Sequence, residues 1–285
     1  IGVEKDIQKA LSWYKIAADK GVIPAMRKYA ELNSNKDESI QYYKMAADLG
    51  DIESLDQLGD LTNDLEYYKK AADLGNVESA NKYAYHKSKN NEIEEAIHYF
   101  KLAAEKYDST AIYNYSLLLH QNDHINEHEM KKIVDYYEQS ILSGDSQSMI
   151  NLGEIYEDGD IGIEQDISKA FEYFKKASDA ENEEGSFNCG RILEDYYDDD
   201  LNALSYYQIA AEDNNIDAML RLVKILIRNN GDKNEILSYL NKAVEFESAE
   251  GMYLLGTIYS EGKLVEQDLK KARELFLEAE KNGYQ

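Results

Sequence analysis

The apolar positions of this chain recur with helical spacing in nine segments. In each segment an aromatic pair, or its substitute, is followed three residues after its second member by a small residue. With the second aromatic as position zero, apolar or small residues fall at −4, −1, 0, +3 and +4, which places them on one face of an α-helix. The pattern predicts nine amphipathic helices, which we call helices B. Their zero positions are Tyr14, Tyr43, Tyr68, Phe100, Tyr137, Phe174, Tyr207, Leu240 and Phe276.

Polar residues and glycines mark the ends of these predicted helices. Eight residues before each zero position stands an acidic residue or an asparagine. Asp and Asn accept hydrogen bonds from the free amides of the first turn, a cap worth about 1 kcal/mol, and Glu suits the positive end of a helix. The expected caps are Asp6, Asn35, Asp60, Glu92, Glu129, Asp166, Asp199, Asp232 and Asp268. The glycines expected to end helices in a left-handed conformation are Gly21, Gly50, Gly75, Gly144 and Gly283.

A second pattern, small-x-x-x-apolar-small-x-x-apolar, lies between successive helices B. It is clearest as Ser148, Leu152, Gly153 and Tyr156. A glycine inside a helix costs up to about 1 kcal/mol relative to Ala, so its recurrence requires a compensating contact. Close approach of two helices in a hairpin provides that contact and predicts eight helices A. The second small site is occupied by Ala30, Gly59, Ala84, Ser116, Gly153, Gly190 and Gly256, with Val223 as the exception.

The alternation of helices A and B predicts the architecture. Successive zero positions are 25 to 37 residues apart, and units of this length bury their apolar faces only against their neighbours. We therefore expect an all-α, right-handed superhelical solenoid of stacked antiparallel helical hairpins. Residues 1–285 should form a single array, in which an orphan helix B at about residues 6–20 precedes eight A/B hairpins. Because the chain enters a repeat at its inter-helix loop, we expect it to be cut from a longer array.

The repeat resembles a known family. The segment LGEIYEDGDIGIEQDISKAFEYFKKA, from Leu152 to Ala177, is similar to the Sel-one-like repeat, a relative of the tetratricopeptide repeat with the pattern LGxxYxxGxGVxxDxxKAxxWYxKAA. The last copy, from Leu255, matches nearly as well. The resemblance implies a scaffold that assembles protein complexes, as in the adaptor subunit of the endoplasmic-reticulum ubiquitin ligase, activators of chitin synthase and bacterial proteins that engage host factors. A cysteine-rich branch associated with β-lactam binding implies a remote alternative, a hydrolase.

The charge of the chain bears on its partners. There are 56 acidic and 31 basic residues, and the net charge is −25. Such a surface repels phosphate backbones and anionic lipids, so nucleic acid is not expected as a ligand, whereas a basic partner is favoured. The alternative is that the charge only keeps a long surface soluble. The acidic run Glu194, Asp195, Asp198, Asp199 and Asp200 is expected to be a solvated loop before a helix B.

Membrane insertion and disulfide bonding are not expected. No stretch approaches the roughly 20 apolar residues of a membrane span. The single cysteine, Cys189, excludes an internal disulfide and is expected to be buried. It favours a reducing compartment and hence a cytoplasmic location. The endoplasmic-reticulum lumen and secretion stay open, because the N-terminus looks truncated.

Two clusters hint at metal binding, and neither has the full signature. His120, His124 and His128 are spaced i, i+4, i+8, but Asn and Asp interrupt this segment, which is an insertion between helices A and B. A variable polar loop is therefore favoured over a zinc site. The segment Asp158-x-Asp160-x-Gly162 lacks the terminal glutamate of a calcium loop. No nucleophile–base or phosphate-loop signature occurs. We expect no metal, no cofactor and no catalysis.

The candidate binding surface is a polar row on helix A, three residues after its first small position. In tetratricopeptide-like stacks helix A lines the concave groove, so matching positions of successive units lie in line along it. The row is Lys28, Gln57, Lys82, Asn114, Asn151, Asn188, Arg221 and Leu254. Its three asparagines, in successive units, offer donors and acceptors to the backbone of an extended peptide, and neighbouring cations suit a carboxylate or phosphate. The predicted partner-binding residues are Asn114, Asn151, Asn188, Arg191, Arg221 and Lys224; the alternative is an ordinary wetted face.

These observations favour a non-enzymatic scaffold or adaptor that binds a protein or peptide through its concave surface. A regulatory subunit that recruits or activates a partner enzyme is the alternative, because the residues do not separate this role from that of a passive scaffold.

Overall fold

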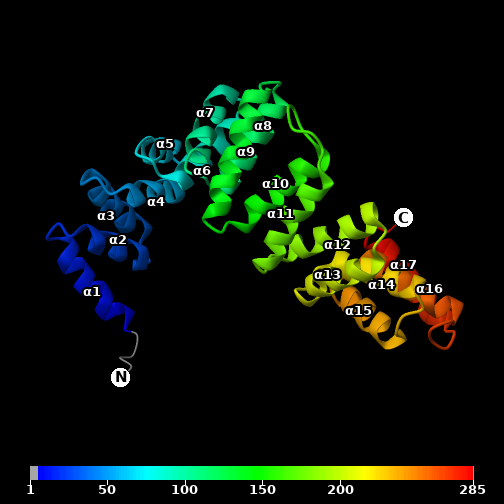
Figure 1. Cartoon of the computed structure of the whole chain (residues 1–285). Helices are drawn as coiled ribbons and strands as arrows, with labels where there is room; N and C mark the ends of the chain where they lie inside the picture. The colour runs from blue at the N-terminus through cyan, green and yellow to red at the C-terminus, as the bar shows by residue number, and fades with distance from the viewer. Residues whose placement is uncertain (1–5, 285) are drawn as a thin grey trace. The chain divides into compact units, whose positions relative to one another are not determined.

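The computed structural model describes residues 6–284, and within them the regular secondary structure is helical, apart from one isolated bridge between Asp160 and Ile163. Helices B and A alternate from α1 to α17 (Figure 1). The helices B are α1 (Ile7–Ala18), α3 (Lys36–Asp48), α5 (Leu65–Asp73), α7 (Ile93–Ala104), α9 (Glu127–Leu142), α11 (Ile167–Asp179), α13 (Asp200–Glu212), α15 (Lys233–Glu245) and α17 (Leu269–Lys281). The helices A are α2 (Ile23–Leu32), α4 (Ile52–Thr62), α6 (Val77–Lys89), α8 (Ser109–Gln121), α10 (Ser146–Asp158), α12 (Glu183–Tyr197), α14 (Ile216–Arg228) and α16 (Ala249–Glu261).

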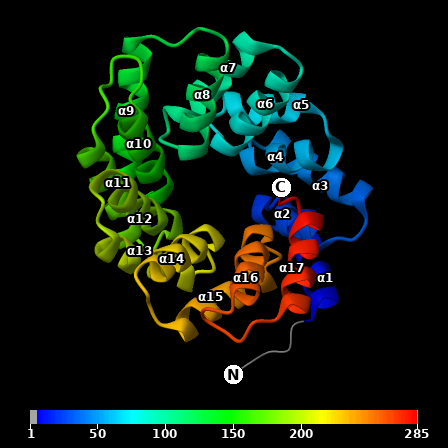
Figure 2. The same cartoon turned by 90° about the vertical axis from the view of Figure 1, so that its right-hand side faces the viewer.

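The chain consists of two compact units, residues 1–140 and 141–285, which we call unit 1 and unit 2. Within each unit, consecutive helices pack against one another, from α1 to α8 in unit 1 and from α10 to α17 in unit 2 (Figure 2). This confirms the all-α stack of antiparallel hairpins. A single continuous array stays a prediction. No helix within residues 6–284 is both long and apolar enough to cross a membrane.

Where the small site of helix A is glycine, a helix B ring lies over it in the core of the hairpin. In α14 and α15, Val223 and Leu240 take these two places. A Cβ added to Gly153 would lie 2.5 Å from Cε1 of Phe174, and one added to Gly190 would lie 2.7 Å from Cδ1 of Tyr207. Both rings are fully buried. The recurrent glycines are therefore needed for close helix approach, as predicted. Cys189 is also buried, as expected, and burial raises the pKa of its thiol to about 12.

Most of the predicted N-caps are confirmed, and two are wrong. Asp60 lies inside α4, where its carboxylate accepts a hydrogen bond from Tyr68, and Asp64 caps α5 instead. This repeat has the shortest step between zero positions, so its cap lies closer to the helix B ring. Glu129 lies in the first turn of α9, and Asn126 accepts the bonds from the first amides. The five predicted terminating glycines have φ between 85° and 93°.

Candidate partner-binding surface

The predicted asparagine row lies on helices A but is less open than expected. Asn114 is half-buried on α8 in unit 1. In unit 2, Asn151 on α10 and Asn188 on α12 are only 8% and 7% exposed. The Gln147 amide donates to Oδ1 of Asn151 (3.1 Å), and the Arg191 guanidinium donates to Oδ1 of Asn188 (3.3 Å). The expectation of an open row is thus corrected for these two side chains, because neighbouring side chains cover them.

The three predicted cations are paired within the chain. Arg191 reaches from α12 to α10 and binds both carboxylate oxygens of Glu157, whose side chain is buried. These hydrogen bonds raise the pKa of the Arg191 guanidinium. The other two also bridge neighbouring helices A: Arg221 binds Glu194 and Asp195, each at 3.1 Å, and Lys224 binds Glu250 at 2.6 Å. In this structure all three contact carboxylates of the chain itself, and the pairs join α10, α12, α14 and α16.

The acidic run near residue 200 is not a free loop, which corrects the sequence interpretation. Its first two residues belong to α12. Asp198 adopts the left-handed conformation that ends α12, and Asp199 caps α13. Asp200 begins α13 and binds Arg228 at 2.8 Å. The run therefore shapes the turn between the two helices of one hairpin.

An accessible acidic pair lies on neighbouring helices A of unit 2. Glu154 on α10 and Glu184 on α12 are both exposed. Loss of solvation among neighbouring helices raises the pKa of Glu154, and the charges of Glu184, Asp158 and Glu157 raise it further. A basic group placed here would relieve that repulsion. This surface therefore suits a cation better than an anion.

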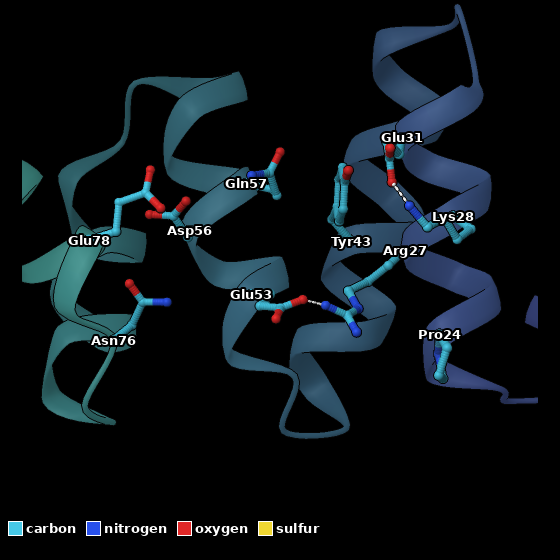
Figure 3. A pocket seen from close by; sticks show the side chains of 10 residues that line it. All are labelled: Pro24, Arg27, Lys28, Glu31, Tyr43, Glu53, Asp56, Gln57, Asn76 and Glu78. Atoms are coloured by element: carbon cyan, nitrogen blue, oxygen red, sulfur yellow. Dashed lines mark hydrogen bonds and ion pairs between the residues drawn. The ribbon is translucent and has the colours of Figure 1, made fainter. Parts of the chain in front are cut away.

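Unit 1 carries a pocket of about 650 Å³ on its helix A surface, between α2, α4 and α6 (Figure 3). Two members of the predicted row, Lys28 and Gln57, line it, which places this part of the row where a partner would have access. Tyr43 of α3 contributes an aromatic wall. The complete lining is Pro24, Arg27, Lys28, Glu31, Tyr43, Glu53, Asp56, Gln57, Asn76 and Glu78.

Carboxylates outnumber cations in and around this pocket. Arg27 pairs with Glu53, and Lys28 pairs with Glu31 at 2.6 Å (Figure 3). A single ammonium, that of Lys82, serves three carboxylates: Asp56 at 3.0 Å, Asp60 at 3.1 Å and Glu78 at 2.9 Å. Burial lowers the pKa of Lys82, but these hydrogen bonds outweigh it and raise the pKa. The pocket wall formed by α4 and α6 thus retains negative charge.

Sequence reasoning missed this pocket as a site. The informative signal was the charge at positions one and four residues before the row, namely Arg27 and Asp56 at the first, and Glu53 and Glu78 at the second. The positions four residues before the row lie one helical turn from it and share its face, and the positions one residue before the row are their i,i+3 neighbours. The sequence prediction rested on the three asparagines, which lie in other repeats.

Histidines of the predicted metal segment contact other groups of the chain. Nε2 of His124 lies 3.8 Å from Oε1 of Glu94. Nδ1 of His120 contacts the carbonyl oxygen of Ser116, one turn earlier in α8. Among the residues that the structure describes, no three His, Cys, Asp or Glu side chains gather as a metal site.

Stacked antiparallel hairpins, with a helix B ring over a small residue of helix A, define the class of tetratricopeptide-like α-solenoids. Residues 1–22, 25–51, 65–76, 77–108, 146–182, 197–215 and 249–284 match the Sel1 repeat. These segments make up more than half of the chain, which therefore belongs to the Sel1 repeat family. No match was found among curated proteins.

Two solved structures support the fold. A protective antigen of uropathogenic Escherichia coli that displays an SLR fold is 23% identical with a TM-score of 0.69, over 94% of this chain and 63% of the antigen. A Sel1 repeat protein from Oxalobacter formigenes is 18% identical with a TM-score of 0.61, over 81% of this chain and 99% of that protein. The chain thus spans less than two thirds of the antigen.

Proposed function

We propose that the chain is a non-enzymatic adaptor that binds a protein or peptide through the helix A surfaces of its units. The pocket between α2, α4 and α6 carries the proposal, because it combines volume, access and two residues of the predicted row. Its surplus of carboxylates favours a partner that is basic at the point of contact. The exposed Glu154 and Glu184 of unit 2 favour the same chemistry. Repeat proteins of this kind use such extended surfaces for binding.

Affinity capture with the chain, followed by identification of the bound segment, supplies the partner for the test. Glu78→Lys should then weaken binding of that segment at least tenfold in calorimetry, a loss of about 1.4 kcal/mol or more. Glu66→Lys is the matched control, because Glu66 is an exposed glutamate in the first turn of the neighbouring helix B, α5. It should leave the affinity within about twofold.

Binding should also weaken as salt increases, because rim charges act mainly through screened electrostatics. An acidic partner, or equal losses with Glu78→Lys and Glu66→Lys, would contradict the proposal. Thermal melting of both variants separates a binding defect from a folding defect.

A further inference from the structure

A contact of three side chains recurs in unit 1. A helix A tyrosine donates a hydrogen bond to a glutamate of the following helix B, and a lysine of the preceding helix B pairs with the same glutamate. Each lysine directly follows a zero position, and each tyrosine ring is buried. The three sets are Tyr29, Glu38 and Lys15, then Tyr83, Glu95 and Lys69, and finally Tyr115, Glu129 and Lys101.

The hairpin of α4 and α5 lacks two members of this contact. Leu58 stands in α4 where the other helices A of unit 1 carry the tyrosine. Helix α5 begins only at Leu65, so Asn63, which stands at the position of Glu38, ends α4 instead of belonging to a helix B. The lysine is retained as Lys44, and among the described residues 6–284 its ammonium has no carboxylate partner. The missing tyrosine and glutamate thus leave an unpaired cation.

A pocket of about 620 Å³ lies at this place, between α3, α4 and α5. Its lining includes Leu58 and Lys44, the counterparts of Tyr29 and Lys15. Lys44 is exposed, whereas Leu58 is fully buried. Leu74, at the end of α5, adds an exposed apolar side chain to the wall. All three helices belong to unit 1, so the pocket is formed within the stack and not at one of its ends.

Tyr67 of α5 lines the same pocket and is only half-buried. Its counterparts Tyr42 and Tyr99 are 6% and 4% exposed. Each of these two rings packs edge-on against a helix A tyrosine, with centroids 4.6 Å apart, and donates its hydroxyl to an aspartate at the end of the preceding helix B. In the part of the chain that the structure describes, the Tyr67 hydroxyl makes no such bond, although the equivalent Asp48 lines the pocket.

We propose that this pocket binds a tyrosine side chain of a partner protein, from a segment that also carries an acidic residue beside that tyrosine. The partner's ring occupies the place that Tyr29 fills in the preceding hairpin, where it contacts Leu58 and packs edge-on against Tyr67. The partner's carboxylate pairs with Lys44, as Glu38 pairs with Lys15 at 2.6 Å. The recognised chemistry is therefore aromatic and acidic.

This site differs from the pocket between α2, α4 and α6 in both position and charge preference. The two pockets share no lining residue. The first favours a basic group, whereas Lys44 favours an acidic one. The two proposals can therefore fail separately.

The probe for the test is the peptide acetyl-Glu-Tyr-Glu-amide, whose tyrosine ring carries one fluorine atom, so that fluorine NMR reports on the ring directly. Titration with the whole chain should shift and broaden this signal, with saturation at one peptide per chain. The control probe, acetyl-Lys-Tyr-Lys-amide with the same ring, should bind more weakly. The net charge of −25 favours the opposite order, so tighter binding of the acidic probe identifies local recognition.

Three variants locate the binding. Lys44→Glu should weaken binding of the acidic probe by about fivefold or more, because an attraction becomes a repulsion. Lys175→Glu is the matched control, because Lys175 is exposed and also directly follows a zero position, in α11 of unit 2. It should leave the affinity within about twofold. Leu58→Tyr restores the ring that the other hairpins carry, so it should close the pocket and abolish binding, while thermal melting checks that the variant is folded.

The absence of any binding of the acidic probe with a Kd below about 5 mM would overturn the proposal. Equal affinities of the unchanged chain and Lys44→Glu would overturn it as well. A folded Leu58→Tyr variant that binds the acidic probe as tightly as the unchanged chain would have the same consequence. If Leu58→Tyr does not fold, the comparison of Lys44→Glu with Lys175→Glu decides the case.

Discussion

Unit 1 and unit 2 build the same hairpin but place the helix A tyrosine one turn apart. In unit 1 the tyrosine directly precedes the small site, and its hydroxyl donates a hydrogen bond to a glutamate of the following helix B. The pairs are Tyr29 to Glu38, Tyr83 to Glu95 and Tyr115 to Glu129, at 2.7 to 2.8 Å. In unit 2 it lies three residues after the small site, and its hydroxyl accepts from a lysine of helix B: Lys169 to Tyr156 at 2.6 Å and Lys271 to Tyr259 at 2.7 Å.

The difference separates what the repeat requires from what it tolerates. The ring over the small site sets the distance between the two helices and occurs in both units. The polar contact can run in either direction, because a tyrosine hydroxyl both donates and accepts. The helix B residue five before the zero position follows the choice in four hairpins: it is Glu38 or Glu95 in unit 1, and Lys169 or Lys271 in unit 2. Helix α9 departs from this, because Lys132 stands there and the acceptor Glu129 lies eight residues before the zero position.

The two units consequently differ in electrostatics. Hydrogen bonds from Lys15, and then from Asn33 and Tyr29, lower the pKa of Glu38 to about 2. Unit 2 instead contains the exposed Glu154 with a raised pKa. Residues 141–285 have 31 acidic and 14 basic side chains, a net charge of −17, against 25 and 17 in residues 1–140, a net charge of −8. A basic partner should therefore approach unit 2 under the stronger attraction.

The largest expected effect tests the contact that the two units share. Gly153→Leu in unit 2 should destabilise the chain by about 3 kcal/mol, because the added side chain meets the buried Phe174 ring and forces the helices apart. Glu172→Leu adds the same side chain at an exposed position of α11 and should change stability by less than about 0.5 kcal/mol. Urea unfolding followed by circular dichroism measures both. Equal free energies of unfolding for Gly153→Leu and Glu172→Leu would contradict the view that the ring contact is the feature both units require.

A smaller effect distinguishes the two tyrosine positions. Tyr83→Phe in unit 1 should cost about 1 kcal/mol, because the Glu95 carboxylate loses a part-buried hydrogen bond. Tyr156→Phe in unit 2 should cost less than about 0.5 kcal/mol, because the Lys169 ammonium, 3.9 Å from the ring centroid, still lies over a phenylalanine ring. Unfolding curves of the two variants provide the comparison. A larger loss of stability for Tyr156→Phe than for Tyr83→Phe would contradict this prediction.

The smallest effect is a difference in acid sensitivity. The pKa of Glu38 is lowered from 4.5 to about 2. Burial acts to raise the pKa of Glu129, but hydrogen bonds from Tyr115 and Lys132 outweigh it and lower that pKa to about 2 as well. A depressed folded-state pKa contributes stability that is present above pH 4.5 and is lost as the pH falls towards 2.

Between pH 5 and pH 3, α2, α3, α8 and α9 of unit 1 should therefore lose more hydrogen-exchange protection than α10 and α11 of unit 2. The raised pKa of Glu154 acts in the opposite direction, because its folded form takes up a proton more readily. Glu38→Gln should flatten the pH dependence of α2 and α3. An equal loss of hydrogen-exchange protection in both units would contradict the lowered pKa values of Glu38 and Glu129 as the cause.

Much of the fold could be predicted, because its determinants are local. The helix B pattern, the cap at Asp6 and the glycine over the ring of Phe174 each follow from residues within one hairpin. The cap of α5 could not be predicted from the common register, because a shortened loop moved it to Asp64. The candidate binding surface was harder to predict than the fold, because the solvent exposure of a helix A side chain depends on its neighbours in other repeats.

The sequence by itself determined the helices, their order and the small residue under each ring, because periodicity and capping act over a few residues of chain. The tertiary structure alone decided which helix A side chains are accessible. Arg191 binds Glu157, 34 residues earlier, and covers Asn188. In the pocket between α2, α4 and α6, Lys28 and Gln57 line open volume instead. The physical reason is that side chains such as Arg191 bridge neighbouring helices A. Only the stacking of complete hairpins brings the two ends of such a bridge within hydrogen-bond distance.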